Sequence, residues 1–210
     1  MHATIALTGL FVVLVLCSEA TGRQWGRRAF KPLASIGFVL CALLAGATST
    51  HYGRWILSGL VLCLLGDLFL LSREVRPFRA GLFSFLLGHV AYATAFVVRG
   101  VDWLWAASAA LILVAIALPV GRWLLPYVGA AMKLPVMAYI AVISLMVALG
   151  AGAFGANRLP ILLIAPVAFY LSDLAVARDR FVKKSFVNRL WGLPLYYMAQ
   201  LLFAISVGAA

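Results

Sequence analysis

Uninterrupted apolar runs long enough to cross a lipid bilayer occupy most of this chain. A transmembrane helix needs roughly 20 mostly apolar residues, and backbone groups surrounded by lipid must be hydrogen-bonded internally. A β-barrel would instead show short segments of alternating polarity. Because 65% of the residues are hydrophobic and only 11% are charged, the sequence predicts an all-α, polytopic membrane protein.

Charged residues and Gly or Pro breaks divide the chain into eight expected helices. They cover residues 3–20, 33–49, 55–71, 80–98, 103–119, 134–151, 159–177 and 192–208. The connections are short, which favours antiparallel neighbours. We find no repeat or low-complexity tract, so we expect residues 1–210 to form a single eight-helix transmembrane domain.

Basic residues gather in alternate connections, and this pattern predicts an orientation. The second, fourth and sixth connections carry only Arg54, Arg99 and Arg158. The odd-numbered connections carry Arg23, Arg27, Arg28, Lys31, Arg73, Arg76, Arg79, Arg122, Lys133, Arg178, Arg180, Lys183, Lys184 and Arg189. By the positive-inside rule, the odd connections are cytoplasmic and both termini lie on the non-cytoplasmic side of the cell membrane. The net charge of +11 is therefore explained by topology, and we expect no nucleic-acid partner.

Two acids fall inside the expected helices, Asp67 and Asp173. A carboxylate in hydrocarbon costs about 2.5–3.5 kcal/mol on insertion scales, and such residues commonly mark functional sites. Both lie about one turn from the cytoplasmic ends of their helices. Two carboxyls in one low-dielectric pocket do not both ionise easily, so one acid and one anion would stand side by side, as acid–base catalysis requires. The alternative is that each acid is structural and pairs with an arginine such as Arg73 or Arg178.

Other polar side chains are expected at a similar depth in the cytoplasmic half. They are His89, Tyr92, Tyr196, Tyr197 and Gln200. The histidine has an alternative interpretation as a hydrogen-bonded core residue, and the last two tyrosines as part of an interfacial aromatic belt. Their convergence on the layer of the two acids favours a site.

Ser172 directly precedes Asp173 but lacks the glycines of a nucleophile elbow, so we expect it to hydrogen-bond within the site or to the backbone. Zinc hydrolases typically need several histidines. Because His2 and His51 are expected near the outer face, far from His89, the sequence predicts neither a metal nor another cofactor.

Four sequence blocks, in this order and spacing, carry a family resemblance. The blocks are residues 65–70 around Gly66 and Asp67, residues 78–96 with Gly81, Phe85, Gly88, His89 and Tyr92, residues 169–181 with Ser172, Asp173 and Arg180, and residues 196–201 with Tyr196, Tyr197 and Gln200. Together they resemble the YhhN-like family of membrane lysoplasmalogenases over nearly the whole chain. The sequence departs from the family pattern at Ala165 and Pro166, where the family tends to have Gly-Ala.

The resemblance implies a hydrolase that cleaves the vinyl-ether bond of lysoplasmalogens, with a lysophospholipid and water as its reactants. The products would be a fatty aldehyde and glycerophospho-ethanolamine or -choline. It implies catalysis by Asp173 as acid and Asp67 as base, or the reverse. The residues implied around the substrate are His89, Ser172, Tyr92, Tyr196, Tyr197 and Gln200, with Arg180 and either Lys183 or Arg73 on the phosphate.

Three other functions remain open from the sequence. A proton-coupled transporter could use paired intramembrane acids, although Pro166 is the only mid-span breaker and no inverted repeat is found. An aspartyl intramembrane protease is disfavoured because Leu65 replaces the first glycine of a Gly-x-Gly-Asp motif. A hydrolase of another lysolipid or of a lipid amide would need much the same residues. The sequence does not indicate an oligomeric state.

Overall fold

The computed structural model describes residues 1–72 and 74–209, and all regular secondary structure in this part of the chain is helical. Its α-helices are α1 (His2–Ala20), α2 (Gln24–Leu44), α3 (His51–Phe69), α4 (Val75–Arg99), α5 (Trp103–Leu124), α6 (Ala130–Asn157), α7 (Ile161–Ala177) and α8 (Phe186–Ser206). Among these described helices, all but α2 are long and apolar enough to cross a membrane. The prediction of an all-α, multi-pass membrane protein is thus confirmed.

The boundaries predicted for the second helix, 33–49, are wrong at both ends. Helix α2 begins at Gln24, because Arg and Lys have good helix propensity and do not by themselves interrupt a helix. It ends at Leu44, where Gly46 takes a positive φ of 85°. The amide of Ala47 then bonds to the carbonyl of Ala42, and that of Gly46 to Leu43, which is a Schellman ending.

As a consequence, several cations expected in connections lie on helices. Arg27, Arg28 and Lys31 belong to the first turns of α2, and Arg189 to α8. Helix α8 starts before the predicted residue 192 because Ser185 caps it, its hydroxyl accepting from the amide of Val187. These corrections matter for function, since a cation on a helix is held at a fixed depth.

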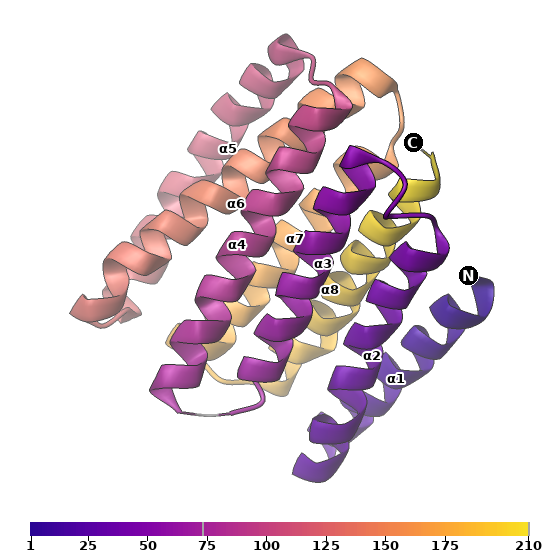
Figure 1. The fold of residues 1–210 in the computed structure, drawn as a ribbon. Helices are drawn as coiled ribbons and strands as arrows, with labels where there is room; N and C mark the ends of the chain where they lie inside the picture. Colours follow the sequence, from indigo (N-terminus) through magenta and orange to yellow (C-terminus); the bar gives the residue numbers. More distant parts are fainter. Residues whose placement is uncertain (73, 210) are drawn as a thin grey trace.

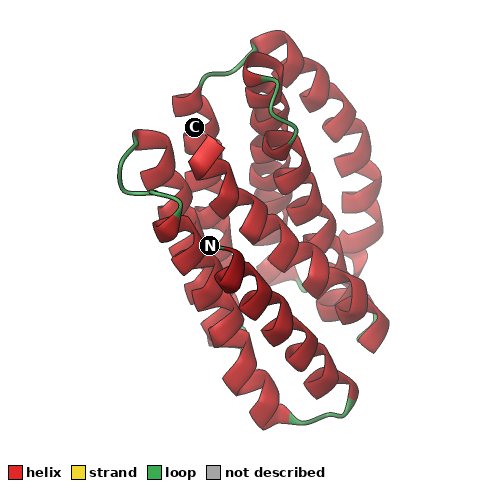
Figure 2. Cartoon of the chain, turned by 90° about the vertical axis from the view of Figure 1, so that its right-hand side faces the viewer, coloured by secondary structure: helices red, strands yellow, loops and turns green. Residues whose placement is uncertain are grey.

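The helices form an antiparallel bundle in which both chain ends lie toward one end (Figures 1 and 2). Two contacts fix this arrangement: Tyr52 at the start of α3 hydrogen-bonds Ser206 at the end of α8 at 2.6 Å, and Arg99 at the end of α4 donates to the carbonyl of Ala209 at 2.8 Å. The connections α1–α2, α3–α4, α5–α6 and α7–α8 lie at the opposite end, with most of the basic residues. That this end faces the cytoplasm stays a prediction.

An aromatic cluster from α4, α7 and α8 forms the centre of the bundle. Phe169 packs against the rings of Phe85, Tyr92, Tyr196 and Phe203. Helix α3 approaches this cluster closely because it presents glycine there: a Cβ on Gly66 would overlap the ring of Phe85. Small residues at helix contacts allow such close packing in membranes. This contact places the next residue, Asp67, at the edge of the aromatic centre.

Candidate active site

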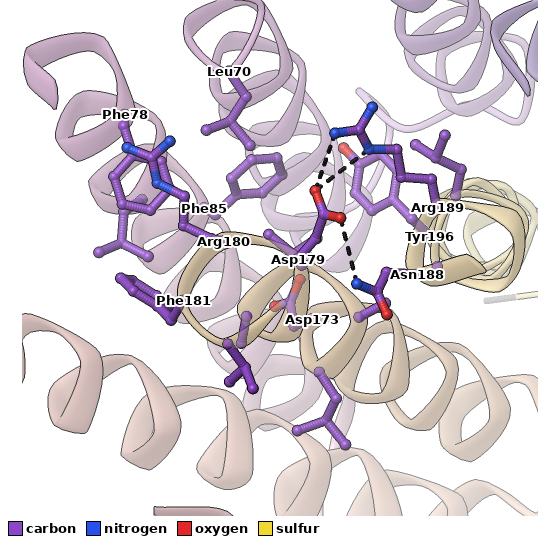
Figure 3. Close-up of a pocket in the computed structure, with 18 of the residues that line it drawn as sticks. Leu70, Phe78, Phe85, Asp173, Asp179, Arg180, Phe181, Asn188, Arg189 and Tyr196 are labelled. Carbon is purple, nitrogen blue, oxygen red and sulfur yellow. Dashed lines mark hydrogen bonds and ion pairs between the residues drawn. The ribbon is translucent and has the colours of Figure 1, made fainter. Parts of the chain in front are cut away.

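A cavity of about 480 Å³ opens at the basic end of the bundle, and both Asp67 and Asp173 line it. Its wall combines apolar and aromatic side chains with charged ones, and its size is within the ~300–1,000 Å³ common for ligand pockets. Figure 3 shows part of this wall, including Asp173, Phe85 and Tyr196. The structure therefore places the two acids predicted from the sequence on one shared cavity.

Asp67 is contacted by three donor groups from other parts of the chain. The Nζ atom of Lys31 lies 3.0 Å from its Oδ1 atom, and the hydroxyls of Ser35 and Tyr196 each donate to Oδ2 at 2.7 Å. Only 3% of the Asp67 side chain is exposed. A buried carboxylate with a cation and two hydrogen bonds has its charged form stabilised, so this environment suits a base or an electrostatic stabiliser.

Lys31 and Ser35 were not predicted as site residues. They stand one turn apart on α2, and the Ser35 hydroxyl bonds back to the Lys31 carbonyl at 3.1 Å. Tyr197 supports the same turn, since its hydroxyl lies 3.2 Å from that of Ser35 and 3.3 Å from the Lys31 carbonyl. The i, i+4 spacing of Lys31 and Ser35 could have indicated that they share one face of α2. It was missed because the predicted helix began at residue 33, after Lys31.

Asp173 has a different set of partners. The Tyr139 hydroxyl donates to its Oδ2 atom at 2.7 Å, and the Nε2 atom of His89 lies 3.4 Å from the same oxygen without the alignment of a hydrogen bond. The other ring nitrogen of His89, Nδ1, is 2.6 Å from the carbonyl oxygen of Phe85. No lysine or arginine ion pair with Asp173 occurs among residues 1–72 and 74–209.

The contacts of His89 bear on which of its ring nitrogens carries a hydrogen. A carbonyl oxygen only accepts hydrogen bonds, so Nδ1 of His89 carries a hydrogen. The His89 side chain is fully buried. If its imidazole were neutral and Asp173 were ionised, the lone pair of Nε2 would face a carboxylate oxygen. One further proton, shared between Nε2 and the carboxyl, removes this repulsion. The pair is therefore suited to donate a proton.

The remaining polar residues predicted for the site do not reach the cavity. Tyr92 donates to Oε1 of Gln200 at 2.6 Å in the buried interior. The Ser172 hydroxyl donates to the carbonyl of Phe169 at 2.8 Å, which is the backbone alternative considered for it. Neither these side chains nor those of Tyr197 and His89 line the cavity; Tyr197 contributes through Ser35, and His89 through Asp173.

Two of the three cations predicted to bind phosphate, Arg180 and Lys183, do line the cavity. The guanidinium of Arg180 lies over the ring of Phe78, 3.9 Å from its centroid (Figure 3). The neighbouring Lys184 also lines the cavity, whereas Arg73 lies outside the described residues. A cluster of cations therefore stands where the bundle meets its basic end.

A separate polar network fixes the turn that carries these cations. The segment η2 (Arg178–Val182) is a π-helical turn after α7, and Asp179 within it accepts from the backbone of Ser185 at 2.8 Å. Asp179 also pairs with Arg189 at 3.1 Å, as Figure 3 shows, and Arg189 in turn pairs with Glu19. The structural alternative in which Arg178 pairs with Asp67 or Asp173 is not realised.

Arg178 instead donates to Oδ1 of Asn188 at 2.7 Å. Asp67 does form an ion pair, as the structural alternative expected, but its partner is Lys31 and not an arginine. Because Asp67 still lines the cavity, this ion pair and a chemical role are compatible.

The sequence blocks around these residues match a known family, whose model aligns with residues 26–207. The chain belongs to the YhhN family. This YhhN-family chain is also similar to a bovine (Bos taurus) protein named lysoplasmalogenase TMEM86A, with 28% identity over 204 residues that cover 93% of the chain and 83% of the relative. No solved structure matches it.

Proposed function

We propose that this YhhN-family protein is a lysoplasmalogenase, which hydrolyses the vinyl-ether bond of a lysoplasmenyl-ethanolamine or -choline. The observation that carries the proposal is that two intramembrane acids with unlike partners line one cavity: Asp67 with a lysine and two hydroxyls, Asp173 with a histidine and one hydroxyl. The name of the bovine relative, a lysoplasmalogenase, supports the substrate class.

Vinyl-ether hydrolysis begins with proton transfer to carbon. Donation from the Asp173–His89 pair to the β-carbon of the double bond turns the vinyl ether into an oxocarbenium ion. The positive charge that develops lies on the ether oxygen and its adjacent carbon. Asp67, kept anionic by Lys31, stabilises that charge electrostatically in a buried setting, where such an interaction is strong.

Water addition and collapse return both acids to their starting states. Water attacks the oxocarbenium carbon while Asp67 accepts one of its protons, which gives a hemiacetal. Protonated Asp67 then donates to the glycerol oxygen as the carbon–oxygen bond breaks, and Asp173 accepts the proton of the hemiacetal hydroxyl. One water is consumed, a fatty aldehyde and a glycerophospho-alcohol are formed, and no covalent enzyme intermediate is needed.

The cations of the α7–α8 connection would hold the phosphate. Arg180 is oriented by its contact with Phe78, and a planar guanidinium can bind phosphate with two hydrogen bonds. Lys183 and Lys184 add positive charge on the same cavity. With these roles, the polar head group would lie at the basic end, for which the positive-inside rule predicts the cytoplasmic side of the cell membrane.

The proposal is tested by incubating purified protein in detergent with lysoplasmenyl-ethanolamine and measuring aldehyde release. We expect Asp67→Asn and Asp173→Asn each to lower the rate by at least about 100-fold. Asp102→Asn is a matched control, because Asp102 caps α5 at the other end of the bundle and asparagine is an equally good cap. No aldehyde from the native protein, or full activity in both site variants, would refute the proposal. The ester-linked lysophospholipid, run in parallel, detects a hydrolase of another lysolipid.

A further inference from the structure

We propose that the groove between α5, α6 and α7 binds the aliphatic chain of the substrate and is its lateral entrance from the membrane. This inference rests on the proposed function, since it assigns a place to one part of a single-chain lipid. The groove has a volume of about 280 Å³, and the side chains that line it are apolar except for the Tyr170 hydroxyl.

Continuity with the site identifies the occupant. Tyr170 and Leu174 line both the cavity and the groove, and Leu174 directly follows Asp173. In a lysoplasmalogen, the bond to be cleaved lies at the junction of the polar head and the aliphatic chain. A site for that bond therefore needs cations on one side and an apolar channel on the other. The groove meets the cavity at Tyr170 and Leu174, which are close to Asp173 in the chain.

The groove also has the direction and length that a chain requires. Its α7 wall is formed by Leu163, Val167, Tyr170 and Leu174, which share one helical face. From Leu174 back to Leu163 this face extends roughly 16 Å at ~1.5 Å per residue. A chain that starts at Asp173 would run along it toward the middle of the membrane.

Helix α5 gives the groove its opening. It packs chiefly against α6 and lies at the edge of the bundle (Figure 1). Ile112 on α5 is 63% exposed and Leu171 on α7 is 42% exposed, so both walls reach the lipid-facing surface. A single-chain lipid could enter sideways here without leaving the bilayer.

Chain-length selectivity provides the test. Val167→Trp should fill the groove part-way along. Leu111→Trp is the control, because Leu111 on α5 is 75% exposed and precedes the groove residue Ile112 but does not line the groove. We expect Val167→Trp to lower kcat/KM roughly tenfold for an octadecenyl substrate, the effect of about two methylenes losing their burial. Activity on an octenyl substrate should be unchanged, which also shows that the variant is folded. Equal effects on both chain lengths, or none, would overturn the proposal.

A binding measurement separates this proposal from the proposed function. The probe is a lysophospholipid with a diazirine at the end of its aliphatic chain, crosslinked to the native protein in nanodiscs and located by mass spectrometry. We expect labelling on α5 and α7 at the groove, competed by unlabelled lysophospholipid and lost in Val167→Trp but not in Leu111→Trp. Labelling elsewhere, or labelling without competition, would refute the groove as a binding site. If the groove is labelled while no aldehyde is ever formed, the proposed reaction fails and the groove stands.

Discussion

Replacing Lys31 with methionine removes the cation that faces Asp67 and keeps a side chain with a similar apolar stem. The two charged groups are 3.0 Å apart, and their side chains are only 13% and 3% exposed. Breaking a buried ion pair by removing one partner typically costs about 3–5 kcal/mol. We expect a smaller loss, about 2 kcal/mol, because Ser35 and Tyr196 still donate to Asp67 and because the carboxyl can take up a proton.

The loss of activity should be larger than the loss of stability suggests. A protonated Asp67 cannot face the oxocarbenium ion as an anion, and removal of one electrostatic stabiliser typically lowers kcat by about 100- to 1,000-fold. Aldehyde release and thermal unfolding in detergent would be measured for Lys31→Met, for Asp67→Asn and for the double variant. Arg28→Met is the control, since it removes one positive charge from the exposed side of the same helix.

The double variant decides whether the pair is coupled. An asparagine at position 67 needs no cation. The double variant should therefore lose about 1–2 kcal/mol less stability than the two single variants lose in sum, and it should stay inactive. Losses that add within ~0.5 kcal/mol would show that the two side chains act independently. Native activity in Lys31→Met would refute the role given to the anion.

Three further substitutions probe other contacts. His89→Phe keeps the ring volume but removes Nε2, and should lower kcat about 100-fold and change the shape of the pH–rate profile. Arg180→Gln should raise KM for the lysolipid with little change in kcat, and the difference from the native protein should shrink at high salt. Tyr92→Phe leaves Oε1 of Gln200 without its donor, so thermal unfolding should show a loss of about 1–3 kcal/mol with activity retained.

Much of the fold could be predicted because bilayer thickness constrains the chain strongly. Apolar runs gave the number and order of the helices, and the basic connections gave an alternation that the antiparallel bundle reproduces. Helix ends were less predictable because they depend on local caps, such as Ser185 before α8 and the glycine ending of α2. The lateral groove depends on how α5 sits against its neighbours, which no local pattern encodes.

The two acids could be predicted because an aspartate in an apolar run stands out, and so could their partners Tyr196 and His89, but Lys31, Ser35 and Tyr139 could not. Lys31 is one of many cations near a connection, and its i, i+4 spacing to Ser35 becomes informative only once α2 is known to begin at Gln24. Tyr139 looks like an ordinary aromatic residue in a membrane helix. Each becomes a site residue only because α2 and α6 pack where they bring Lys31 to Asp67 and Tyr139 to Asp173.

The difference between the acids has a consequence that distinguishes their single asparagine variants. Asp67→Asn leaves Lys31 as a cation without its anion, in a cavity where the side chain is only 13% exposed, so it should lose stability as well as activity. Asp173→Asn leaves His89, which can stay neutral with Nδ1 bonded to the Phe85 carbonyl, so it should lose activity with little change in stability. Thermal unfolding of the two variants, measured beside aldehyde release, checks this asymmetry. Equal stability losses would mean that the unlike partners do not give the two carboxyls different charge states. That result would refute the assignment of Asp173 as acid and Asp67 as base.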